Sequence, residues 1–499
     1  MDDPIEYFRR SLAINPDTCL IFSGGKQVIT YSDFASQVDQ FTMALLPWKN
    51  AGLPIAIWMK KSVTSLVFIQ AILESGNTYV PIDPEMPLDR LKSIFDVLNP
   101  VLVVCDNDKW DQLKTVCDFE VELENDQLYI GRSILNKSSG SHPEIATILF
   151  TSGSTGVPKG VCIPRIAITS FIEWAQSVLN LSKPMVFSSF APLHFDLSIL
   201  DIFLAFRSGS SLVLFTNDDL KQPENIVLSL KANKVDFWYS TPTALMFLMN
   251  YGKIQELYPD GPKFVLFAGE VFPPQSLKKL MAIWPGSRYY NFYGPTETNV
   301  CTYFEIPDIS RIEGLTEIPL GIVCNHFEAR VKDDFGGDCS ENEIGELHVS
   351  GPALSSGYLN DSLQTNLKFY SGDDGKRWYR TGDFVAINNG IMYFHGRRDR
   401  MIKRRGFRIE LDDVEAAIMK LNLVGRAACV AVKNNKEEVE IISFVEIGMN
   451  DINILGLKIS LSKILPLSYM PDKIIKVNVL PTTSTGKVDY VSLTKEYAR

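Results

Sequence analysis

TSGSTGVPKG, residues 151–160, directly follows an apolar run, IATILF (145–150), that predicts a short buried strand. Its glycines allow successive backbone N–H groups to point into one concavity, while its hydroxyls and Lys159 add hydrogen-bond donors and a positive charge. This chemistry suits a polyphosphate. An isolated Gly/Ser run is equally typical of a flexible surface loop, so it is the flanking apolar segments that favour a nucleotide loop here.

The same segment does not match a Walker A loop, which closes with Gly-Lys-Ser/Thr on a helix N-terminus. Val157 and Pro158 separate Gly156 from Lys159, and a residue before proline is biased away from helix. We therefore expect helical structure only after Pro164.

Composition predicts a soluble globular protein. A chain of 499 residues is too long for one ordinary core, so we expect two or more domains. The net charge of −10 argues against nucleic acid or an anionic membrane as the main partner. No apolar run has the length of a bilayer span, and acidic residues near the N-terminus replace the basic region of a signal peptide, so we expect a cytoplasmic location. The eight cysteines form no CxxC pair and the five histidines show no metal-ligand spacing.

The pattern along the chain predicts an α/β fold. Apolar strand-like runs alternate with amphipathic helical segments up to about residue 390, which is typical of mostly parallel sheets covered by helices. Short β-rich runs with Gly, Asn and Asp turns between 330 and 395 predict a β-rich subdomain. We expect a large N-terminal domain at 1–396, a hinge at 397–399 and a small α+β C-terminal domain at 400–499.

Further glycine-punctuated segments follow the opening loop in a fixed order. They are HFDLSILDIF (194–203), FAGE (267–270), NFYGPTET (291–298), GELHVSG…SSGYLN (345–360), YRTGD (379–383), GRRDRMIKRRGFRIEL (396–411) and LPTTSTGKVDY (480–490). Each segment alone is weakly specific. Together, over nearly the whole chain, they resemble the adenylate-forming superfamily, and most closely the amino-acid-activating domains of non-ribosomal peptide synthesis.

The resemblance implies that the protein binds ATP and Mg²⁺. It implies that Tyr293 stacks on adenine beside Asn291, that Asp383 and Arg397 hold the ribose, and that Glu297 meets the metal, a hard cation that prefers oxygen ligands. Taken alone, Asp383 in a TGD segment is equally a turn aspartate. The residues implied to bind ATP are Thr151, Ser152, Gly153, Ser154, Thr155, Gly156, Gly269, Glu270, Asn291, Tyr293, Gly294, Thr296, Asp383 and Arg397.

The resemblance also implies three catalytic residues, Lys487, Lys159 and His194. A carboxylate must attack an α-phosphate, so two anions meet, and a lysine that bridges them supplies positioned electrostatic stabilisation. Lys487 taken alone is a solvated lysine near the C-terminus, and His194 is equally a core histidine.

A third implication concerns motion between the domains. Asp399 resembles a hinge residue about which the small domain rotates after adenylation. The basic run IKRRGFR (402–408) would then line a thiol tunnel or meet an acidic carrier protein, although such a run is also typical of a solvated surface.

The amino-acid pocket is likewise carried over from the family. Asp196 would pair with the substrate α-ammonium, because a buried carboxylate is costly without a partner; alone, it is equally a helix N-cap. An apolar lining leaves no partner for a polar side chain, so the substrate would be a small or medium apolar amino acid. The implied lining residues are Asp196, Leu197, Leu200, Tyr239, Leu266, Ala268, Phe292, Val300 and Cys301, with Lys487 closing the set.

This lining is similar to that of free-standing enzymes that load L-proline onto a carrier protein for antibiotic or toxin biosynthesis. The alternatives are a D-alanine–carrier-protein ligase, in which a bulkier cysteine usually replaces Ala268, and an acyl-CoA ligase, against which Asp196 argues. A catalytically dead binding subunit would have lost Lys159, Glu297 or Lys487, which are all present. Only twelve residues follow Lys487, so we expect a phosphopantetheinylated carrier protein to act in trans.

Overall fold

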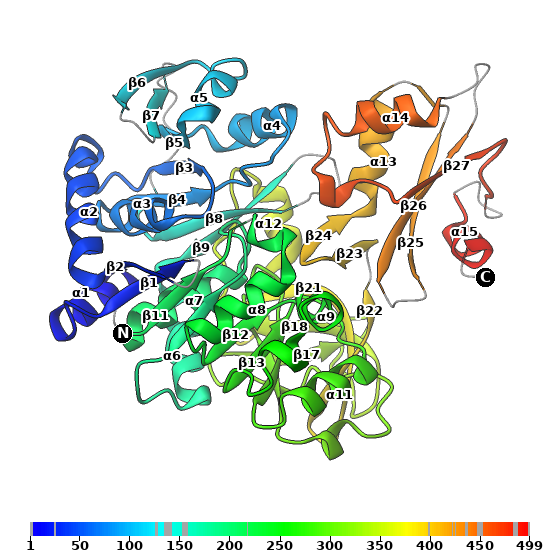
Figure 1. Ribbon diagram of the computed structural model, residues 1–499. Helices are drawn as coiled ribbons and strands as arrows, with labels where there is room; N and C mark the ends of the chain where they lie inside the picture. Colours follow the sequence, from blue (N-terminus) through cyan, green and yellow to red (C-terminus); the bar gives the residue numbers. More distant parts are fainter. Residues whose placement is uncertain are drawn as a thin grey trace.

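The computed structural model describes residues 3–23, 26–124, 128–133, 142–151, 158–216, 218–397, 400–421, 423–424, 426–434, 438–446, 453–482 and 488–497. These residues form two large mixed sheets, a β-rich unit and a separate C-terminal α+β unit (Figure 1). The predicted α/β fold class is confirmed. None of the helices in the described ranges is long and apolar enough to cross a membrane.

The first large sheet contains the strands that flank the opening loop. Its order is β19 (Gly357–Tyr358), β9 (Lys159–Pro164), β8 (Ile145–Thr151), β4 (Thr78–Pro81), β3 (Pro54–Trp58), β5 (Leu102–Asp106), β7 (Leu128–Ser133) and β6 (Phe119–Glu124). β8 and β9 form an antiparallel hairpin in which Thr151 lies opposite Lys159. A strand follows the loop, and the next helix begins at Arg165, as the two prolines predict.

The second large sheet carries most of the predicted amino-acid pocket. Its order is β16 (Ile322–Val323), β15 (Thr302–Ile306), β14 (Arg288–Tyr293), β13 (Phe264–Ala268), β12 (Phe237–Ser240), β10 (Val186–Ser189), β11 (Ser211–Leu214), β1 (Cys19–Ser23) and β2 (Lys26–Thr30). The strands from β14 to β1 pair in parallel, and the pairs at both edges are antiparallel.

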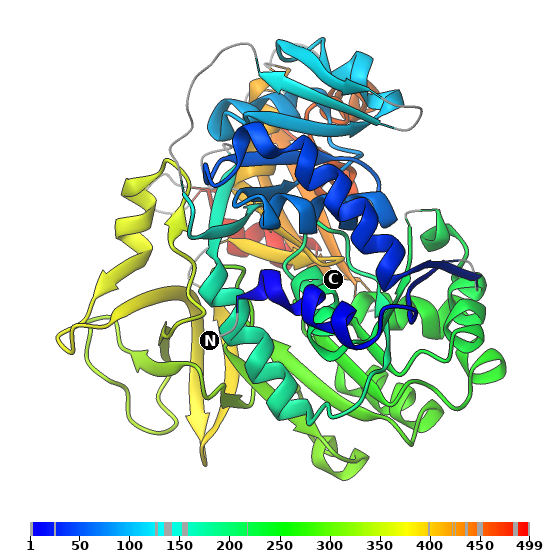
Figure 2. The ribbon, with the colours of Figure 1, turned by 90° about the vertical axis from the view of Figure 1, so that its left-hand side faces the viewer.

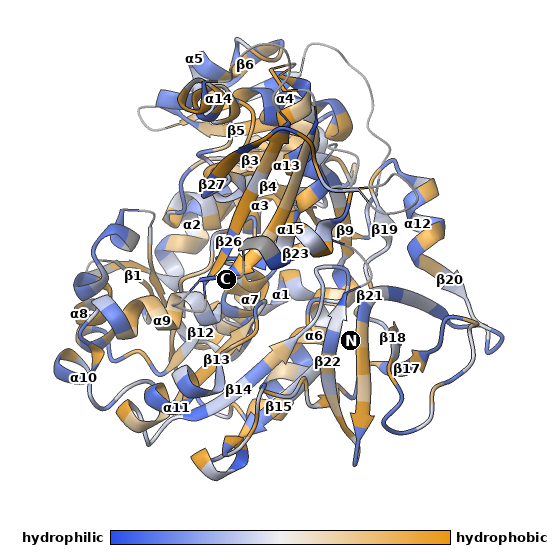
Figure 3. Cartoon of the chain, turned by 90° about the vertical axis from the view of Figure 1, so that its right-hand side faces the viewer, coloured by the Kyte–Doolittle hydropathy of each residue, from blue (hydrophilic) through white to orange (hydrophobic). Residues whose placement is uncertain are grey.

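Helices cover these sheets and fill the space between them (Figures 1 and 2). One hydrophobic core contains residues of both sheets and of the helices between them. Figure 3 shows apolar residues along strands such as β13, whereas helices such as α8 and α11 mix apolar and polar residues. The helices before the C-terminal unit are α1 (Pro4–Ile14), α2 (Tyr31–Ala44), α3 (Val63–Glu74), α4 (Leu88–Leu98), α5 (Asn107–Leu113), α6 (Arg165–Leu179), α7 (Leu197–Ser208), α8 (Pro223–Ala232), α9 (Pro242–Tyr251), α10 (Ile254–Leu257), α11 (Pro274–Ile283) and α12 (Ser362–Lys368).

The β-rich unit and the C-terminal unit follow in sequence. The former contains β17 (Glu328–Lys332), β18 (Gly345–Ser350), β20 (Phe369–Ser371), β21 (Arg377–Asn388) and β22 (Ile391–Arg397). The latter contains β23 (Met401–Arg404), β24 (Phe407–Glu410), α13 (Leu411–Lys420), β25 (Ala427–Lys433), β26 (Val439–Glu446), α14 (Ile454–Leu461), β27 (Lys473–Val477) and α15 (Tyr490–Tyr497), coloured orange to red in Figure 1. The predicted hinge falls between β22 and β23; Asp399 lies outside the described residues, and the hinge stays a prediction.

Helix α7 carries Leu197 and Leu200, two residues of the predicted amino-acid pocket. Its residues from Leu197 to Phe206 are all buried, so the helix is enclosed on every side. Among them is Asp201, whose pKa is raised by burial from 3.8 to about 7, an effect that the Lys61 ammonium opposes. Lys61 donates to the carbonyls of Ser189 and Ala191 at the end of β10, at 2.6 and 2.7 Å. A titratable pair therefore lies between α7 and the sheet.

We predict that replacing Asp201 by Asn changes the pH dependence of stability. Because the folded-state pKa is the higher one, the folded protein binds more protons between pH 3.8 and 7, and its stability falls as the pH rises through that window. Asparagine does not titrate. The free energy of unfolding of Asp201→Asn should therefore gain about 2–3 kcal/mol relative to wild type between pH 5 and 8.

Urea unfolding at pH 5, 6, 7 and 8 measures this difference. Asp260→Asn, at an exposed carboxylate, serves as the matched control and should show no such trend. A wild-type-minus-variant difference that stays constant with pH would show that Asp201 is charged throughout.

Candidate functional site

Six of the nine described residues predicted to bind ATP line one cavity, together with Phe292 of the predicted amino-acid pocket. Its volume is about 650 Å³, within the usual range for small-molecule sites, and it lies between the second large sheet, the β-rich unit and the C-terminal unit. Predicted residues that line it are Gly269, Glu270, Asn291, Phe292, Tyr293, Asp383 and Arg397. Segments up to 128 positions apart in the sequence thus converge where the resemblance places ATP.

Hydrogen bonds fix the polar side chains of this cavity. Tyr293 Oη donates to Asp383 Oδ2 at 2.5 Å, and Arg397 donates to Asp383 Oδ1 at 2.5 Å. Asn291 Nδ2 donates to the Pro319 carbonyl at 2.7 Å, which leaves the amide oxygen as the acceptor that an exocyclic amine needs. The cavity wall is therefore built before any nucleotide enters it.

Asp383 is not a turn residue. It lies within β21, opposite Arg397 of β22, next to a register shift in that strand pair. The interpretation as a lone turn aspartate is wrong, because the irregularity of the ladder turns the buried carboxylate toward Tyr293 and Arg397.

Glu297 is fully buried in an ion pair with Arg408 of the C-terminal unit. The Arg408 Nη1 atom lies 2.8 Å from Oε2 and 3.1 Å from Oε1, and Tyr358 Oη donates to Oε1 at 2.7 Å. Although burial opposes it, the Arg408 charge holds the pKa of Glu297 at about 2, with help from Tyr358. In the described part of the chain no group of three or more His, Cys, Asp or Glu side chains could hold a metal. Glu297 supplies one carboxylate, a ligand type that suits Mg²⁺, but Arg408 is paired with it in this structure.

A narrow channel of about 90 Å³ lies at the domain junction, and Asp196 is one of the residues that line it. His194 and Thr296 line it on the side of the large sheets, and Gly406 and Phe407 line it on the side of the C-terminal unit. Thr151 and Arg408 also contribute to its wall. Three residues of the basic run predicted to line a thiol tunnel, Gly406, Phe407 and Arg408, therefore line the same channel as Asp196.

Further contacts hold the C-terminal unit at this channel. The backbone N–H of Gly406 donates to Glu270 Oε1 at 2.8 Å, and Glu270 Oε2 accepts from Thr243 at the start of α9. Arg90 of α4 and Asp413 of α13 form an ion pair at 2.9 Å. Glu270 thus links α9 to the C-terminal unit.

His194 and Lys159 line the approaches to this region. His194 Nε2 lies 3.9 Å from Asp83 Oδ2, and burial lowers the pKa of the imidazole. Lys159 lies 3.4 Å from Gln364 Oε1 and 5.8 Å from the Tyr358 ring centroid; burial lowers the pKa of its ammonium. Ser152, Gly153, Ser154, Thr155 and Gly156, predicted to hold phosphates, and Lys487 lie outside the described residues.

The predicted apolar lining forms one side of the second sheet. Tyr239 pairs with Leu266, and Ala268 pairs with Phe292. Because side chains alternate along a strand, these four share one face. They belong to the same buried cluster as Leu197 and Leu200 of α7 and as Val300 and Cys301, which precede β15.

Asp196 stands at the open end of this cluster. It occupies the N-cap position of α7, but its side chain makes no capping hydrogen bond. Burial raises its pKa, while Thr296 and the Lys403 ammonium lower it. Asp196 therefore occupies the N-cap position without a capping bond, and its carboxylate interacts with Thr296 and Lys403 instead.

Some residues of this region were not predicted individually. Arg408 and Lys403 were identified only as members of a basic run, and the hydrogen bond from Gly406 to Glu270 was not predicted. Arg408 meets Glu297 across 111 positions, so no local pattern could have paired them. The structure explains why position 294 requires glycine, because a Cβ there would lie 2.1 Å from the Asn299 carbonyl oxygen.

Comparison with known proteins agrees with this arrangement. The family model described as AMP-binding enzyme matches residues 8–359. An L-proline–[L-prolyl-carrier protein] ligase of Pseudomonas fluorescens is 33% identical over 483 residues, covering 94% of this chain and 95% of the relative. A D-alanine–D-alanyl carrier protein ligase of Listeria monocytogenes is 31% identical over 497 residues, covering 96% of both.

Solved structures share the fold. An adenylation domain of Vibrio cholerae in complex with glycyl-adenosine-5′-phosphate superposes with a TM-score of 0.84 at 20% identity, covering 99% of this chain and 97% of that one. With a matching family model over most of its length and full-length relatives above 30% identity, the chain belongs to the AMP-binding enzyme family of ATP-dependent, adenylate-forming ligases.

Proposed function

We propose that this ligase activates L-proline with Mg-ATP and transfers the prolyl group to the phosphopantetheine thiol of a separate carrier protein in the biosynthesis of a secondary metabolite. The observation that carries the proposal is that a 650 Å³ cavity, with its Asn291–Tyr293–Asp383–Arg397 wall, and a separate channel lined by Asp196 both lie where the C-terminal unit meets the large sheets. On this proposal the cavity takes the nucleotide, the apolar cluster that includes Leu197 takes the amino-acid side chain, and the channel takes the thiol.

In the first half-reaction, a carboxylate oxygen of the amino acid attacks the α-phosphorus, the bond to the β-phosphate oxygen breaks, and pyrophosphate leaves. Asn291 and Tyr293 position the base, Asp383 and Arg397 the ribose, and Asp196 the α-ammonium. Thr296, Lys159, His194 and the 152–156 loop bind phosphate oxygens, and Lys487 bridges carboxylate and phosphate. Mg²⁺ beside Glu297 neutralises phosphate charge when bound.

The second half-reaction uses the arrangement in which Arg408 holds Glu297. The thiol enters between Phe407 and His194, its sulfur attacks the carbonyl carbon of prolyl-AMP, the bond to the phosphate oxygen breaks, and AMP leaves while the thiol proton passes to solvent. Arg408 and a metal compete for one carboxylate, so this arrangement follows pyrophosphate release. A rotation about Asp399 connects the two arrangements.

Two observations favour proline over D-alanine. Ala268 leaves more room beside Phe292 than a cysteine would, and the most similar curated relatives include two ligases named for L-proline, at 33% and 31% identity. D-alanine ligases follow at 31% and below, so D-alanine is the second candidate. One methylene is worth only about 1–3 kcal/mol in an apolar pocket, so the choice needs a direct measurement.

That measurement is amino-acid-dependent exchange of labelled pyrophosphate into ATP with L-proline, D-proline, L- and D-alanine, L-valine, L-pipecolate and a short fatty acid. We expect exchange dominated by L-proline. Dominant D-alanine exchange would keep the mechanism and overturn the substrate, and fatty-acid exchange would overturn the role of Asp196.

We predict that Lys487→Ala lowers the rate of this exchange by a factor of about 100 or more, because a positioned charge that acts in the transition state is lost. Lys495→Ala on α15, an exposed lysine of the same terminal segment, is the matched control and should exchange normally. Near-normal exchange by folded Lys487→Ala would contradict the assignment.

We predict that Gly406→Ala separates the half-reactions. Gly406 has φ +83°, and an added Cβ would lie 3.0 Å from Thr241 and 3.1 Å from Phe195, so alanine would push the C-terminal unit away from the channel. Pyrophosphate exchange should stay within about threefold of wild type, while loading of a carrier thiol or pantetheine slows by about tenfold, the effect of about 1.4 kcal/mol.

The control for this variant is Gly390→Ala. Gly390 has a similar φ of +76°, lies in the β21–β22 turn, and has no atom within 4 Å of an added Cβ. It bears the same backbone strain away from the channel. Equal losses in both half-reactions for Gly406→Ala would place the residue in adenylation instead.

A further inference from the structure

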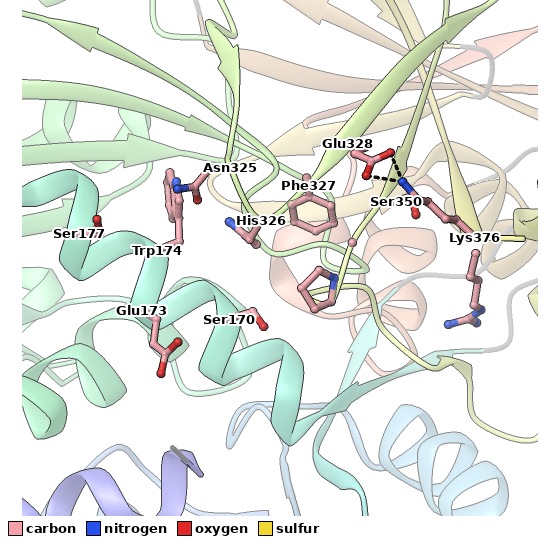
Figure 4. Close-up of a pocket in the computed structure, with 13 residues that line it drawn as sticks. Ser170, Glu173, Trp174, Ser177, Asn325, His326, Phe327, Glu328, Ser350 and Lys376 are labelled. Carbon is pink, nitrogen blue, oxygen red and sulfur yellow. Dashed lines mark hydrogen bonds and ion pairs between the residues drawn. The ribbon is translucent and has the colours of Figure 1, made fainter. Parts of the chain in front are cut away.

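A second large cavity lies behind the amino-acid pocket. Its volume is about 750 Å³, and it opens between α6 and the segments 325–328, 350–352 and 376–377 (Figure 4). Lys376 closes part of its rim through an ion pair with Glu328, at 2.6 Å to Oε2. The nucleotide cavity and the channel share no lining residue with it.

Trp174 of α6 separates this cavity from the predicted pocket. It is 3% exposed, and its ring centroid lies 5.2 Å from that of Phe292, a predicted lining residue. On its other side it lies 5.2 Å from the ring of His326, which faces the cavity (Figure 4). Its indole nitrogen has no hydrogen-bond partner among the described residues. The contacts of Trp174 are thus aromatic.

His326 supports the next part of the same wall. The Val300 backbone raises the pKa of the His326 imidazole, but burial outweighs this effect and lowers the pKa to about 4, so the ring is neutral near pH 7. The short segment around it is tied to the pocket by the Cys324 N–H, which donates to the Cys301 carbonyl at 2.9 Å. Val300 and Cys301 both belong to the predicted lining.

These contacts form a continuous aromatic path from the pocket to the surface. Tyr239 packs against Phe292 at 6.1 Å, Phe292 against Trp174, and Trp174 against His326. Each ring can move only if the next one yields, because interiors are packed at crystal-like density. Beyond His326 the packing ends at the 750 Å³ cavity.

We propose that Trp174 and His326 form an outer wall that sets the size of amino acid the pocket accepts, and that they are specificity-determining positioning residues. The proposal rests on the proposed function, in which Phe292, Val300 and Cys301 line that pocket. Phe292 and Val300 face the substrate, but their positions depend on what backs them. Truncating Trp174 would let Phe292 move outward toward the cavity.

The test compares wild type with Trp174→Leu, Trp174→Phe and His326→Ala in pyrophosphate exchange, using L-proline and L-pipecolate, which has one more ring methylene. For Trp174→Leu we expect the pipecolate-to-proline ratio of kcat/KM to rise about tenfold or more, the usual effect of one methylene. The KM for L-proline should rise while the KM for ATP stays within about twofold. Trp174→Phe, which keeps an aromatic ring, should restore most of the wild-type ratio.

Ser177→Ala is the matched control, because Ser177 lies one turn further along α6 and lines the same cavity without joining the aromatic path. It should leave the ratio unchanged. If Trp174→Leu does not fold, His326→Ala decides, with an expected rise of several-fold. An unchanged ratio in folded variants, or equal changes in the KM for proline and for ATP, would overturn the proposal.

The two proposals fail separately. If wild type prefers another amino acid, the proline assignment fails, and the ratio is then taken between that amino acid and its homologue with one more methylene. If no amino acid supports exchange, the proposed amino-acid activation is wrong, and the proposed role of Trp174 and His326 in substrate size is wrong with it.

Discussion

A buried carboxylate that can serve only one cation at a time connects the two parts of this molecule. Glu297 is removed from water, so its charge must be compensated, and here Arg408 compensates it from the C-terminal unit. A metal bound at Glu297 would compensate it equally well and would leave Arg408 without its partner. The Glu297–Arg408 pair is therefore one of the contacts that hold the C-terminal unit, together with those of Glu270 and Arg90, in the position in which Gly406 and Phe407 line the channel.

Asp196 and Asp383 differ in how the charge of each carboxylate is compensated. Asp383 is satisfied within the protein by Tyr293 and Arg397, which makes it a fixed part of the cavity wall. Asp196 makes no capping bond, and burial raises its pKa although Thr296 and the Lys403 ammonium lower it. A carboxylate that is already paired gives rigidity, whereas one that is incompletely paired gives selectivity for a cationic group. Asp383 lies in β21 of the β-rich unit, and Asp196 lies at the start of α7.

Local patterns predicted those features that local forces determine. The β8 strand, the strand after the opening loop and the start of α6 after Pro164 follow from burial and from proline chemistry. The pairing of Glu297 with Arg408, of Lys61 with Asp201 and of Trp174 with His326 depends on how sheets and helices stack, and such pairs leave no spacing in the sequence. The order of the glycine-punctuated segments predicted a nucleotide site only through the family resemblance, because the segments lie on different sheets and on helix α7.

Selection between amino acids that differ by one methylene requires a wall that does not move. The lining residues on β12, β13 and β14 are fixed along the sheet by backbone pairing, but pairing does not restrain them in the direction normal to the sheet. That restraint comes from what packs behind Phe292 and Val300. Because a 750 Å³ cavity lies immediately beyond Trp174 and His326, the inferred restraint has to come from these two residues and not from a thicker core. If the pocket binds an amino acid as proposed, Trp174 and His326 determine substrate size together with the lining residues.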